Sequence, residues 1–551
     1  MNPLLSLPHL PVILCLGAAF VLILVGDRIS TRARNIQALL IWAVVGVVLC
    51  LLQSRLPVDL VFSDWLLRLM LLGSLSYQVS LLNWAFAFVF WLAFGAELIW
   101  VSREGDAQKD PNLAPGLLAV AGATFSMLFS GNLLTLIFSW AVWLGAIFVL
   151  LVAAKGRNQA IYRLLILFGL AIFLVLWATW SVGQGDGGRW PTLTLSPSAA
   201  ISVFLAAWIA LGAYPFHLWI PVKEKLSPSA RAILHLAPSL VGIYLLARLA
   251  MLQQTLPYAD LWLAVAAIGL VVSAQLAWAH EERSASLSYT GVALAGSVVL
   301  SAVLAAPKAT GLLLSWALAW PLPLLVMWLM PPRVGKKDPR WASYLSFGVL
   351  GLASASLIGL PFTAGFVAWT HLEQVALSGG YFGVIVLLLI VAARILIGGA
   401  LWGALLVPAE KDHVPGLWLR SVLGAILLVP SLLGGLAPDR VIAQIAGPDW
   451  ASWGGQAYSP GFLAAWLVTL VPVALGYALY LARPRMAGRA GRALEFVAGL
   501  WALDWLLHGL ERAGSWLADG LDTVTDILHG EHYLVWAFLV ILLFLWFYLV
   551  S

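Results

Sequence analysis

The residues of this chain that could do chemistry are ionisable side chains set inside long apolar stretches. They are His217 and His235 in one region and His371 and Glu373 in another. A histidine changes charge near neutral pH, and an ionisable residue within a membrane span is a functional candidate by default. The four are therefore ion-path candidates. A neutral histidine hydrogen-bonded at a helix break is at least as common an arrangement.

Three further ionisable residues lie inside or at the ends of apolar stretches, namely Glu97, Arg248 and Arg394. Arg248 closes its stretch, and we expect its guanidinium to extend towards the membrane surface. Arg394 lies nearer the middle of its stretch, where pairing with a buried partner is one of two interpretations. The sequence holds no nucleotide-binding loop, cysteine cluster or nucleophile–base pair. We therefore expect no cofactor, no metal site and no catalytic chemistry of its own.

The composition identifies the elements that must position these side chains. Hydrophobic residues make up 62% of the 551 positions and charged residues 10%, with a mean hydropathy of +0.96. Too little polar surface exists for a water-soluble globule. The apolar runs of about 17 to 26 residues have the length of membrane-spanning helices, which satisfy their own backbone groups. We predict an all-α polytopic membrane protein with about sixteen spans.

The predicted spans cover most of the chain, at residues 9–26, 36–52, 82–102, 114–131, 132–154, 160–182, 199–220, 229–250, 261–280, 287–306, 309–330, 342–375, 382–407, 417–436, 460–482 and 532–550. The region 60–78 holds Asp64 and Arg68 among apolar residues, and it could be an interfacial hairpin instead of another span. The first apolar run lacks a basic n-region and a cleavage site, so we expect a retained span.

The distribution of basic residues predicts the orientation. They cluster in loops that the span order places on one side, around Arg28–Arg34, Lys155–Arg157, Lys223–Arg231, Arg333–Arg340 and Arg483–Arg492. The positive-inside rule makes these loops cytoplasmic and puts both termini on the other side of a bacterial inner membrane. The same bias accounts for the net charge of +5 without a nucleic-acid partner. Glu281, Glu282 and Arg283 are expected to form a solvated cytoplasmic cap.

A family resemblance rests on the stretch from Gly212 to Arg248, GAYPFHLWIPVKEKLSPSARAILHLAPSLVGIYLLAR. A helix-breaking proline, a histidine, a Trp-x-Pro, a Ser-Pro loop and a second histidine follow in this order. The order resembles the antiporter-like subunits of respiratory complex I, Mrp antiporters and membrane-bound hydrogenases. GNLLTLIFSW (131–140), SLSY (286–289) and GLPFTAGF (359–366) resemble further helices of that family.

The resemblance implies about 14 core helices with two inverted five-helix repeats, each containing a broken helix. The breaks fall at 210–221, with Pro215, and at 357–370, with Pro361. Such interrupted helices, one in each half, are typical of inverted repeats. The alternative is that both prolines merely kink packed helices. The implied organisation is N-terminal helices (1–113), first repeat (114–250), second repeat (251–407), two further helices (408–482) and a C-terminal segment (483–551).

The resemblance also identifies ionisable positions that this chain lacks. The family's buried lysine, histidine and glutamate positions fall on Ala141, Ala210, Trp316, Trp320 and Trp369. Alanine cannot bind a proton, and an indole donates a hydrogen bond without titrating near neutrality. We therefore predict a structural, non-pumping membrane-arm subunit of a multisubunit complex. The alternatives are an active proton or cation translocator that uses the remaining His and Glu residues, and a stand-alone solute carrier.

The C-terminal segment predicts a long amphipathic helix before a final transmembrane helix. Apolar residues recur with 4,3 spacing from Phe496 to Leu528, which indicates a helix of about 39 residues and 58 Å. It resembles the lateral helix by which one member of the family holds neighbouring subunits. Residues 490–528 are thus expected to contact other membrane subunits. The alternative is a helix that lies on lipid headgroups.

Overall fold

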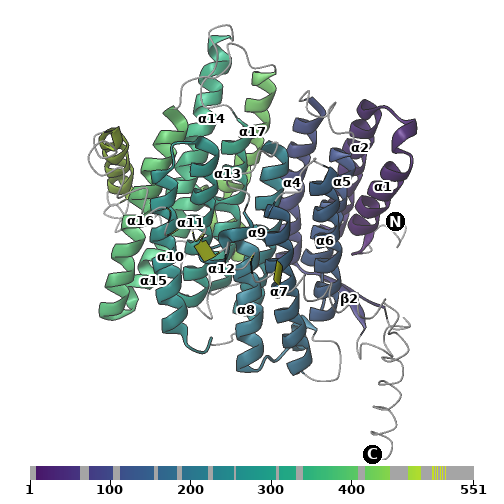
Figure 1. Cartoon of the computed structure of the whole chain (residues 1–551), viewed down its shortest axis with the longest axis horizontal. Helices are drawn as coiled ribbons and strands as arrows, with labels where there is room; N and C mark the ends of the chain where they lie inside the picture. Colours follow the sequence, from purple (N-terminus) through teal and green to yellow (C-terminus); the bar gives the residue numbers. More distant parts are fainter. Residues whose placement is uncertain are drawn as a thin grey trace, which may run out of the picture. The chain divides into compact units, whose positions relative to one another are not determined.

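The structure is a computed structural model that describes residues 8–62, 74–103, 112–153, 159–182, 189–220, 228–252, 256–305, 309–330, 339–406, 416–446 and 469–484, together with scattered residues between 499 and 516. The chain divides into two units, Met1–Arg489 and Ala490–Ser551. The first unit is a bundle of helices that stand side by side (Figure 1). The expected all-α membrane fold is confirmed, because eleven of the described helices are long and apolar enough to span a membrane.

The N-terminal part contains helices and a β-hairpin, with the elements α1 (Leu10–Leu24), η2 (Gly26–Arg28), α2 (Thr31–Gln53), β1 (Val58–Phe62), β2 (Leu75–Val79) and α4 (Leu81–Arg103). In this part, α2 and the second strand of the hairpin contact α4, and α1 packs against α2 and α5 (Leu113–Leu128). The antiparallel strands pair Val58 with Val79 and Phe62 with Leu75. The backbone N–H of Gly131 donates to the carbonyl of Ser76 at 2.8 Å, so the hairpin lies against the loop after α5. The described residues of the region 60–78, which are 60–62 and 74–78, belong to the two paired strands and their flanks.

The first group of helices contains the first break. It comprises α5 (Leu113–Leu128), α6 (Leu133–Ala153), α7 (Gln159–Val182), η4 (Trp190–Thr192), α8 (Pro197–Leu211), η5 (Phe216–Trp219) and α9 (Pro228–Met251). Each helix packs against the next along the chain. α9 is buried over most of its length and also contacts α4, α12 and α13, so it joins this group to the rest of the bundle.

The second group contains the second break. It comprises α10 (Ala259–Ala279), α11 (Arg283–Leu304), α12 (Ala309–Ala319), α13 (Pro321–Leu329), α14 (Arg340–Ile358), α15 (Ala364–Ser378) and α16 (Gly380–Leu406). In each group, one helix break lies in the fourth predicted span. The inverted symmetry between the groups remains a prediction.

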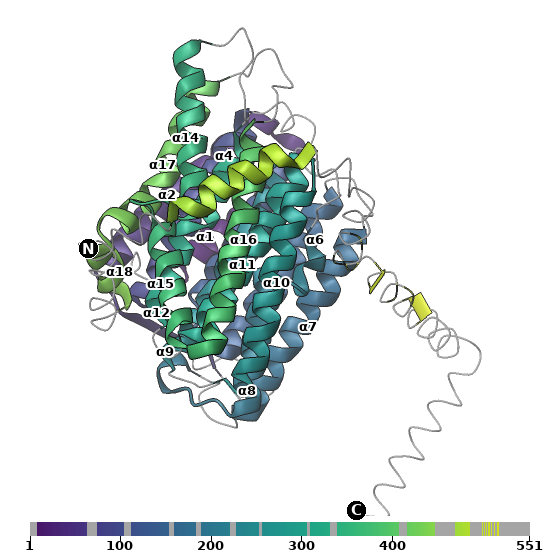
Figure 2. The same ribbon diagram turned by 90° about the vertical axis from the view of Figure 1, so that its left-hand side faces the viewer.

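The last described elements of the first unit lie against the second group. They are α17 (Leu417–Leu436), α18 (Pro438–Ala446) and the helical residues 469–484. The 469–484 helix, drawn in yellow-green, crosses α16 (Figure 2), and the Arg483 guanidinium donates to the carbonyl of Ala279 at 2.9 Å. The final predicted span, 532–550, lies outside the described residues.

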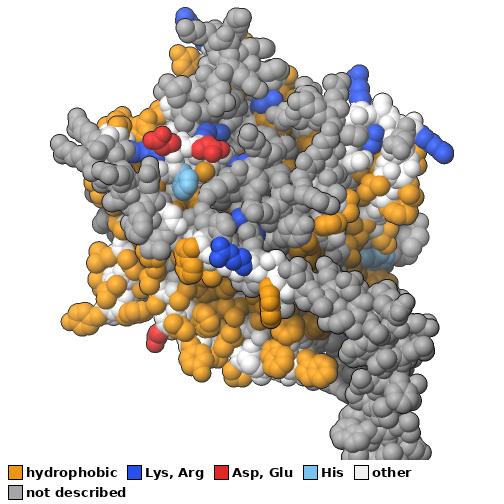
Figure 3. Space-filling view, in the orientation of Figure 1, with side chains coloured by type: hydrophobic (Ala, Val, Ile, Leu, Met, Phe, Trp, Pro, Cys, Tyr) orange, Lys and Arg blue, Asp and Glu red, His pale blue; other side chains and the backbone are white. Residues whose placement is uncertain are grey.

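Hydrophobic and basic side chains occupy different parts of the described surface. Hydrophobic side chains cover much of the lower part of the view, and most of the described Lys and Arg side chains lie in its upper part (Figure 3). A broad apolar band of this kind is what hydrocarbon contact requires.

Candidate functional site

The first helix break follows α8 and is closed by an indole. Gly212 ends the helix with φ +66°, a left-handed conformation that favours glycine. Pro215 lacks the N–H needed to continue the helix. Trp219 folds back so that its Nε1 donates to the carbonyl of Ile209, in the last turn of α8, at 2.8 Å. The expected interruption at 210–221 is therefore present, and neutral groups close it.

The second helix break follows α14 and uses both an indole and a charge. Gly359 ends α14 with φ +86°. The Nε1 of Trp369 donates to the carbonyl of Leu357 at 3.0 Å, and a guanidinium nitrogen of Arg394 donates to that of Ile358 at 2.9 Å. These carbonyls lie in the last turn of α14, where no further helical N–H can reach them. Two donors from neighbouring helices thus satisfy this end.

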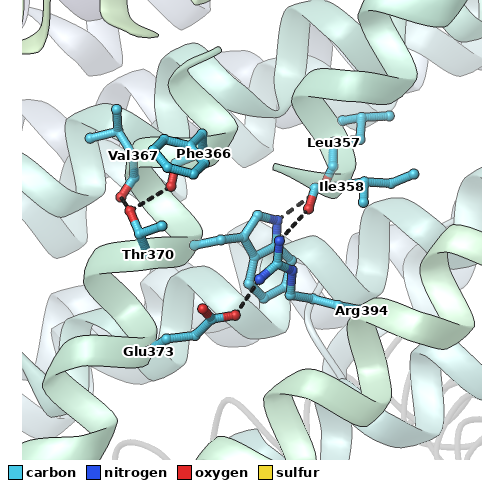
Figure 4. Close-up of polar contacts among 8 residues, drawn as sticks. Leu357, Ile358, Phe366, Val367, Thr370, Glu373 and Arg394 are labelled. Carbon is cyan, nitrogen blue, oxygen red and sulfur yellow. Dashed lines mark hydrogen bonds and ion pairs between the residues drawn. The ribbon is translucent and has the colours of Figure 1, made fainter. Parts of the chain in front are cut away.

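An ion pair holds the guanidinium at the second break. Arg394, on α16, is 1% exposed and pairs with Glu373, on α15, which is 14% exposed. Figure 4 shows this pair beside the end of α14. The guanidinium carbon also lies 5.1 Å from the ring centre of Trp369, within cation–π range. The expected pairing of Arg394 with a buried partner is therefore confirmed.

The candidate histidines are all buried but have different surroundings. His217, in η5, stacks on Tyr214 with ring centres 5.3 Å apart. His371, on α15, has Nδ1 2.7 Å from the carbonyl of Val367 on its own helix. His235, on α9, lies between the rings of Trp219 and Trp328, at 6.3 and 4.7 Å. Their role in ion movement remains a prediction.

Four of the five positions that lack the family's ionisable residues lie in the interior. Ala210 and Trp369 are 0% exposed, and Trp316 and Trp320 are 1% exposed. Ala141 is different, because the structure leaves it exposed on the surface of α6. We expected a buried position at Ala141, and this is wrong, because its side chain faces out of the described bundle.

Large aromatic side chains fill the interior around the first break. Trp143 packs on Phe168 at 4.9 Å and Phe168 packs edge-on against Trp219 at 5.1 Å. Near the second break, Trp316 packs edge-on against Trp369 at 5.0 Å and donates its N–H to the hydroxyl of Ser301 at 2.8 Å. Indoles thus occupy the depth at which the family resemblance implies titratable groups.

The expectation that Arg248 extends towards the membrane surface is wrong. Its side chain is 6% exposed. It donates to the Tyr244 hydroxyl at 2.9 Å and to the side-chain oxygens of Asn83 at 2.7 Å and Gln78 at 3.3 Å. A ring of neutral acceptors from α9, α4 and β2 therefore replaces water around the guanidinium. This cluster joins the hairpin to the bundle.

The prediction that residues 281–283 form a solvated cap holds for two of these three residues. Glu281 and Glu282 are exposed. Arg283, however, donates to the carbonyl of Ala404 at 3.1 Å and to that of Met330 at 3.1 Å. It therefore ties the ends of α16 and α13 together, because a cation at a helix C-terminus satisfies carbonyls that have no helical partner.

The predicted span 309–330 is confirmed as one apolar span, Ala309–Leu329. Its division at Trp320, where α12 ends and α13 begins with Pro321, was not predicted. The signal was present as the Pro-x-Pro at 321–323, because proline disturbs a helix interior. Glu97, one of the ionisable residues that the sequence places in an apolar stretch, is 0% exposed, and its carboxylate oxygens have no hydrogen-bond partner among the described residues.

The predicted lateral helix 490–528 falls almost entirely outside the described residues. A few single residues within it are described and helical, among them Trp505 and Trp516. Its contact with other subunits therefore stays a prediction. Within the described residues no group of His, Cys, Asp and Glu could hold a metal ion.

Comparison with known proteins finds both sequence relatives and solved structures with a similar fold. No protein-family profile matches the chain. NADH-quinone oxidoreductase subunit 14 of Thermus thermophilus is 32% identical over 292 residues, which are 50% of this chain and 65% of the relative. The match thus spans slightly less than two thirds of that relative.

Two solved structures share the fold over nearly the whole chain. One is in the Mrp complex of Dietzia sp., with a TM-score of 0.76 and 20% identity over 97% of this chain and 62% of that one. The other is in the membrane-bound sulfane sulfur reductase, an archaeal respiratory membrane complex, with a TM-score of 0.71 and 15% identity over 98% of this chain and 99% of that one. At these identities the likeness shows the fold.

Proposed function

We propose that the chain is a structural, non-translocating member of the antiporter-like family of membrane subunits, within a multisubunit complex of the complex I or Mrp kind. One observation carries the proposal. The buried positions that match the family's titratable groups hold Ala210, Trp316, Trp320 and Trp369, each at most 1% exposed. None of these side chains exchanges a proton near neutral pH.

The charges that remain support the same function. A proton path needs groups that change charge state in turn. The contacts of Arg394 with Glu373 and with the Ile358 carbonyl hold its guanidinium at the helix break. Its role at the break is to satisfy a backbone carbonyl. The buried histidines of the first break region lie against aromatic rings, His217 on Tyr214 and His235 on Trp219 and Trp328.

Assembly is the role that such a subunit retains. We propose that other membrane subunits of the complex, and lipid, cover its apolar outer surface, including the exposed Ala141 face of α6. The lateral helix 490–528 would contact neighbouring subunits. We further propose that the basic loops face the cytoplasm of a bacterial inner membrane.

The experiment has two arms. The native chain, tagged and extracted in mild detergent, is expected to co-purify with other membrane subunits, identified by mass spectrometry. The same chain alone in liposomes with an internal pH dye is expected to show no proton uptake above that of empty liposomes when a potential or a sodium gradient is imposed. Uptake that disappears in a His235→Phe or His371→Phe variant would establish translocation and overturn the proposal.

A further inference from the structure

A narrow apolar cleft lies where the ends of α4 and α13 meet the beginning of α17. Ala96 and Trp100 line it from α4, Leu329 from α13, and Leu423 and Leu427 from α17. Its volume is about 230 Å³, which includes space open to the outside. The three helices are in contact, and α17 lies beside α13 in Figure 1. Apart from the indole N–H, the side chains named here are hydrocarbon, so this part of the wall suits a hydrocarbon chain.

A cation lies at the mouth of this cleft. Arg420, in the first turn of α17, also lines the cleft, and its guanidinium carbon lies 4.0 Å from the ring centre of Trp100. This cation–π contact holds the guanidinium against the indole. Trp100 is 5% exposed, whereas Arg420 is half-buried. The guanidinium therefore lies between the apolar cleft and the outside.

The surrounding side chains indicate that this cation lies at the depth of lipid headgroups. Trp418, in the first turn of α17, and Trp341 and Tyr344, in the first two turns of the neighbouring α14, are all exposed. Tryptophan and tyrosine gather at the membrane–water interface. Arg420 is also close to the N-terminus of α17, where the helix dipole attracts anions and disfavours a cation. An anion at this position would interact favourably with the guanidinium and with the helix end.

We propose that the cleft binds an anionic phospholipid, with the phosphate at Arg420 and one acyl chain along the cleft between α4, α13 and α17. A guanidinium suits a phosphate, because its planar fork of N–H groups can donate two parallel hydrogen bonds. Basic pockets between membrane helices bind acidic lipid headgroups by the same chemistry. A soluble phosphate would match the guanidinium but not the hydrocarbon wall. The inference does not rest on the proposed function, since lipid can bind whether or not the chain moves ions.

The test is native mass spectrometry of the full chain in detergent, titrated with phosphatidylglycerol or with phosphatidylcholine that carries the same acyl chains. We expect phosphatidylglycerol to bind more tightly, and Arg420→Gln to weaken its binding by about five-fold. Arg340→Gln is the matched control, because Arg340 begins the neighbouring α14 and is exposed. It should change the affinity little. Equal affinity for the two lipids, no effect of Arg420→Gln, or an equal loss in both variants would overturn the proposal.

A second variant tests the cleft independently of the charge. Ala96→Leu places a larger side chain in the cleft, so it should weaken phosphatidylglycerol binding while Arg420 is intact. Unfolding in mixed micelles without added lipid shows that each variant compared is folded. Inorganic phosphate identifies the source of the anion, since millimolar phosphate should leave lipid binding unchanged. Displacement of the lipid by phosphate would indicate a soluble-anion site, and unchanged binding in Ala96→Leu would remove the acyl chain from the cleft. Either result would overturn the proposal.

Discussion

The two helix breaks have the same construction but differ in charge. In each, a glycine with positive φ ends the helix, and the indole of Trp219 or Trp369 donates to a carbonyl in the last turn. Only the second break adds a guanidinium and its carboxylate partner, Arg394 and Glu373.

The difference lies in which side chains satisfy the carbonyls at each break. In hydrocarbon, backbone carbonyls need donors from the protein itself. At the first break two indoles supply them, because Trp219 donates to Ile209 and Trp208 donates to Tyr214. At the second break an indole donates to Leu357 and a guanidinium donates to Ile358. A buried cation needs a carboxylate, which Glu373 supplies.

Placing a charge at the neutral break should have the largest effect. Ala210→Lys puts an ammonium at a position that is 0% exposed, and we expect it to lower the free energy of unfolding by about 5 kcal/mol, from the unpaired charge and from overpacking. Ala210→Leu tests overpacking alone, at about 1–3 kcal/mol. Unfolding in mixed micelles with increasing denaturing detergent measures both. Equal stability of the two variants would contradict a dry, neutral first break.

Removing the carboxylate from the second, charged break should cause the second-largest loss of stability. Glu373→Leu leaves Arg394 unpaired at 1% exposure, and we expect a loss of about 3 kcal/mol. The double variant Glu373→Leu with Arg394→Met should be more stable than Glu373→Leu alone, because no unpaired charge remains. The same unfolding assay gives the coupling energy. A double variant that loses the sum of the single effects would show that the pair is not coupled.

The sequence predicted the breaks because proline and glycine determine backbone geometry locally. Pro215, Pro361 and the following tryptophans are visible as motifs. The partner of Arg394 was predicted only as a class, since the sequence cannot state which residue of α15 faces α16. Arg248 was misplaced for a related reason, because its acceptors Gln78 and Asn83 are more than 160 positions away along the chain.

The sequence also could not predict which apolar residues are exposed on the surface of the bundle. Ala141 and Ala210 both lie in apolar helices, yet the first is exposed and the second is fully buried. Lipid tails are as apolar as a protein core, so hydrophobicity does not separate a lipid-facing residue from a buried one. Only the packing of α6 and α8 within the bundle makes that distinction.

Replacing the glycines that end α14 and α8 with alanine should destabilise the protein to different extents. A Cβ on Gly359 would lie 2.4 Å from Trp369 Cδ1, whereas one on Gly212 would lie 2.9 Å from Trp219 Cζ2. We expect Gly359→Ala to lower the free energy of unfolding by about 2–3 kcal/mol and Gly212→Ala by about 1–2 kcal/mol, from left-handed backbone strain and crowding. The difference arises because Arg394 packs against the Trp369 ring. The reverse order in the unfolding assay would contradict it.

Replacing the indole at each break with a phenyl ring should give the smallest difference in stability. This difference tests most directly whether the charge of Arg394 stabilises the second break. Trp219→Phe removes one hydrogen bond, at about 1 kcal/mol. Trp369→Phe removes the equivalent bond and weakens the cation–π contact with Arg394, for a total of about 1.5–2 kcal/mol. In an Arg394→Met background the cation–π contribution is absent, so the two substitutions should cost the same. If Trp369→Phe remains more destabilising there, the extra stability at the second break comes from ring packing rather than from the charge.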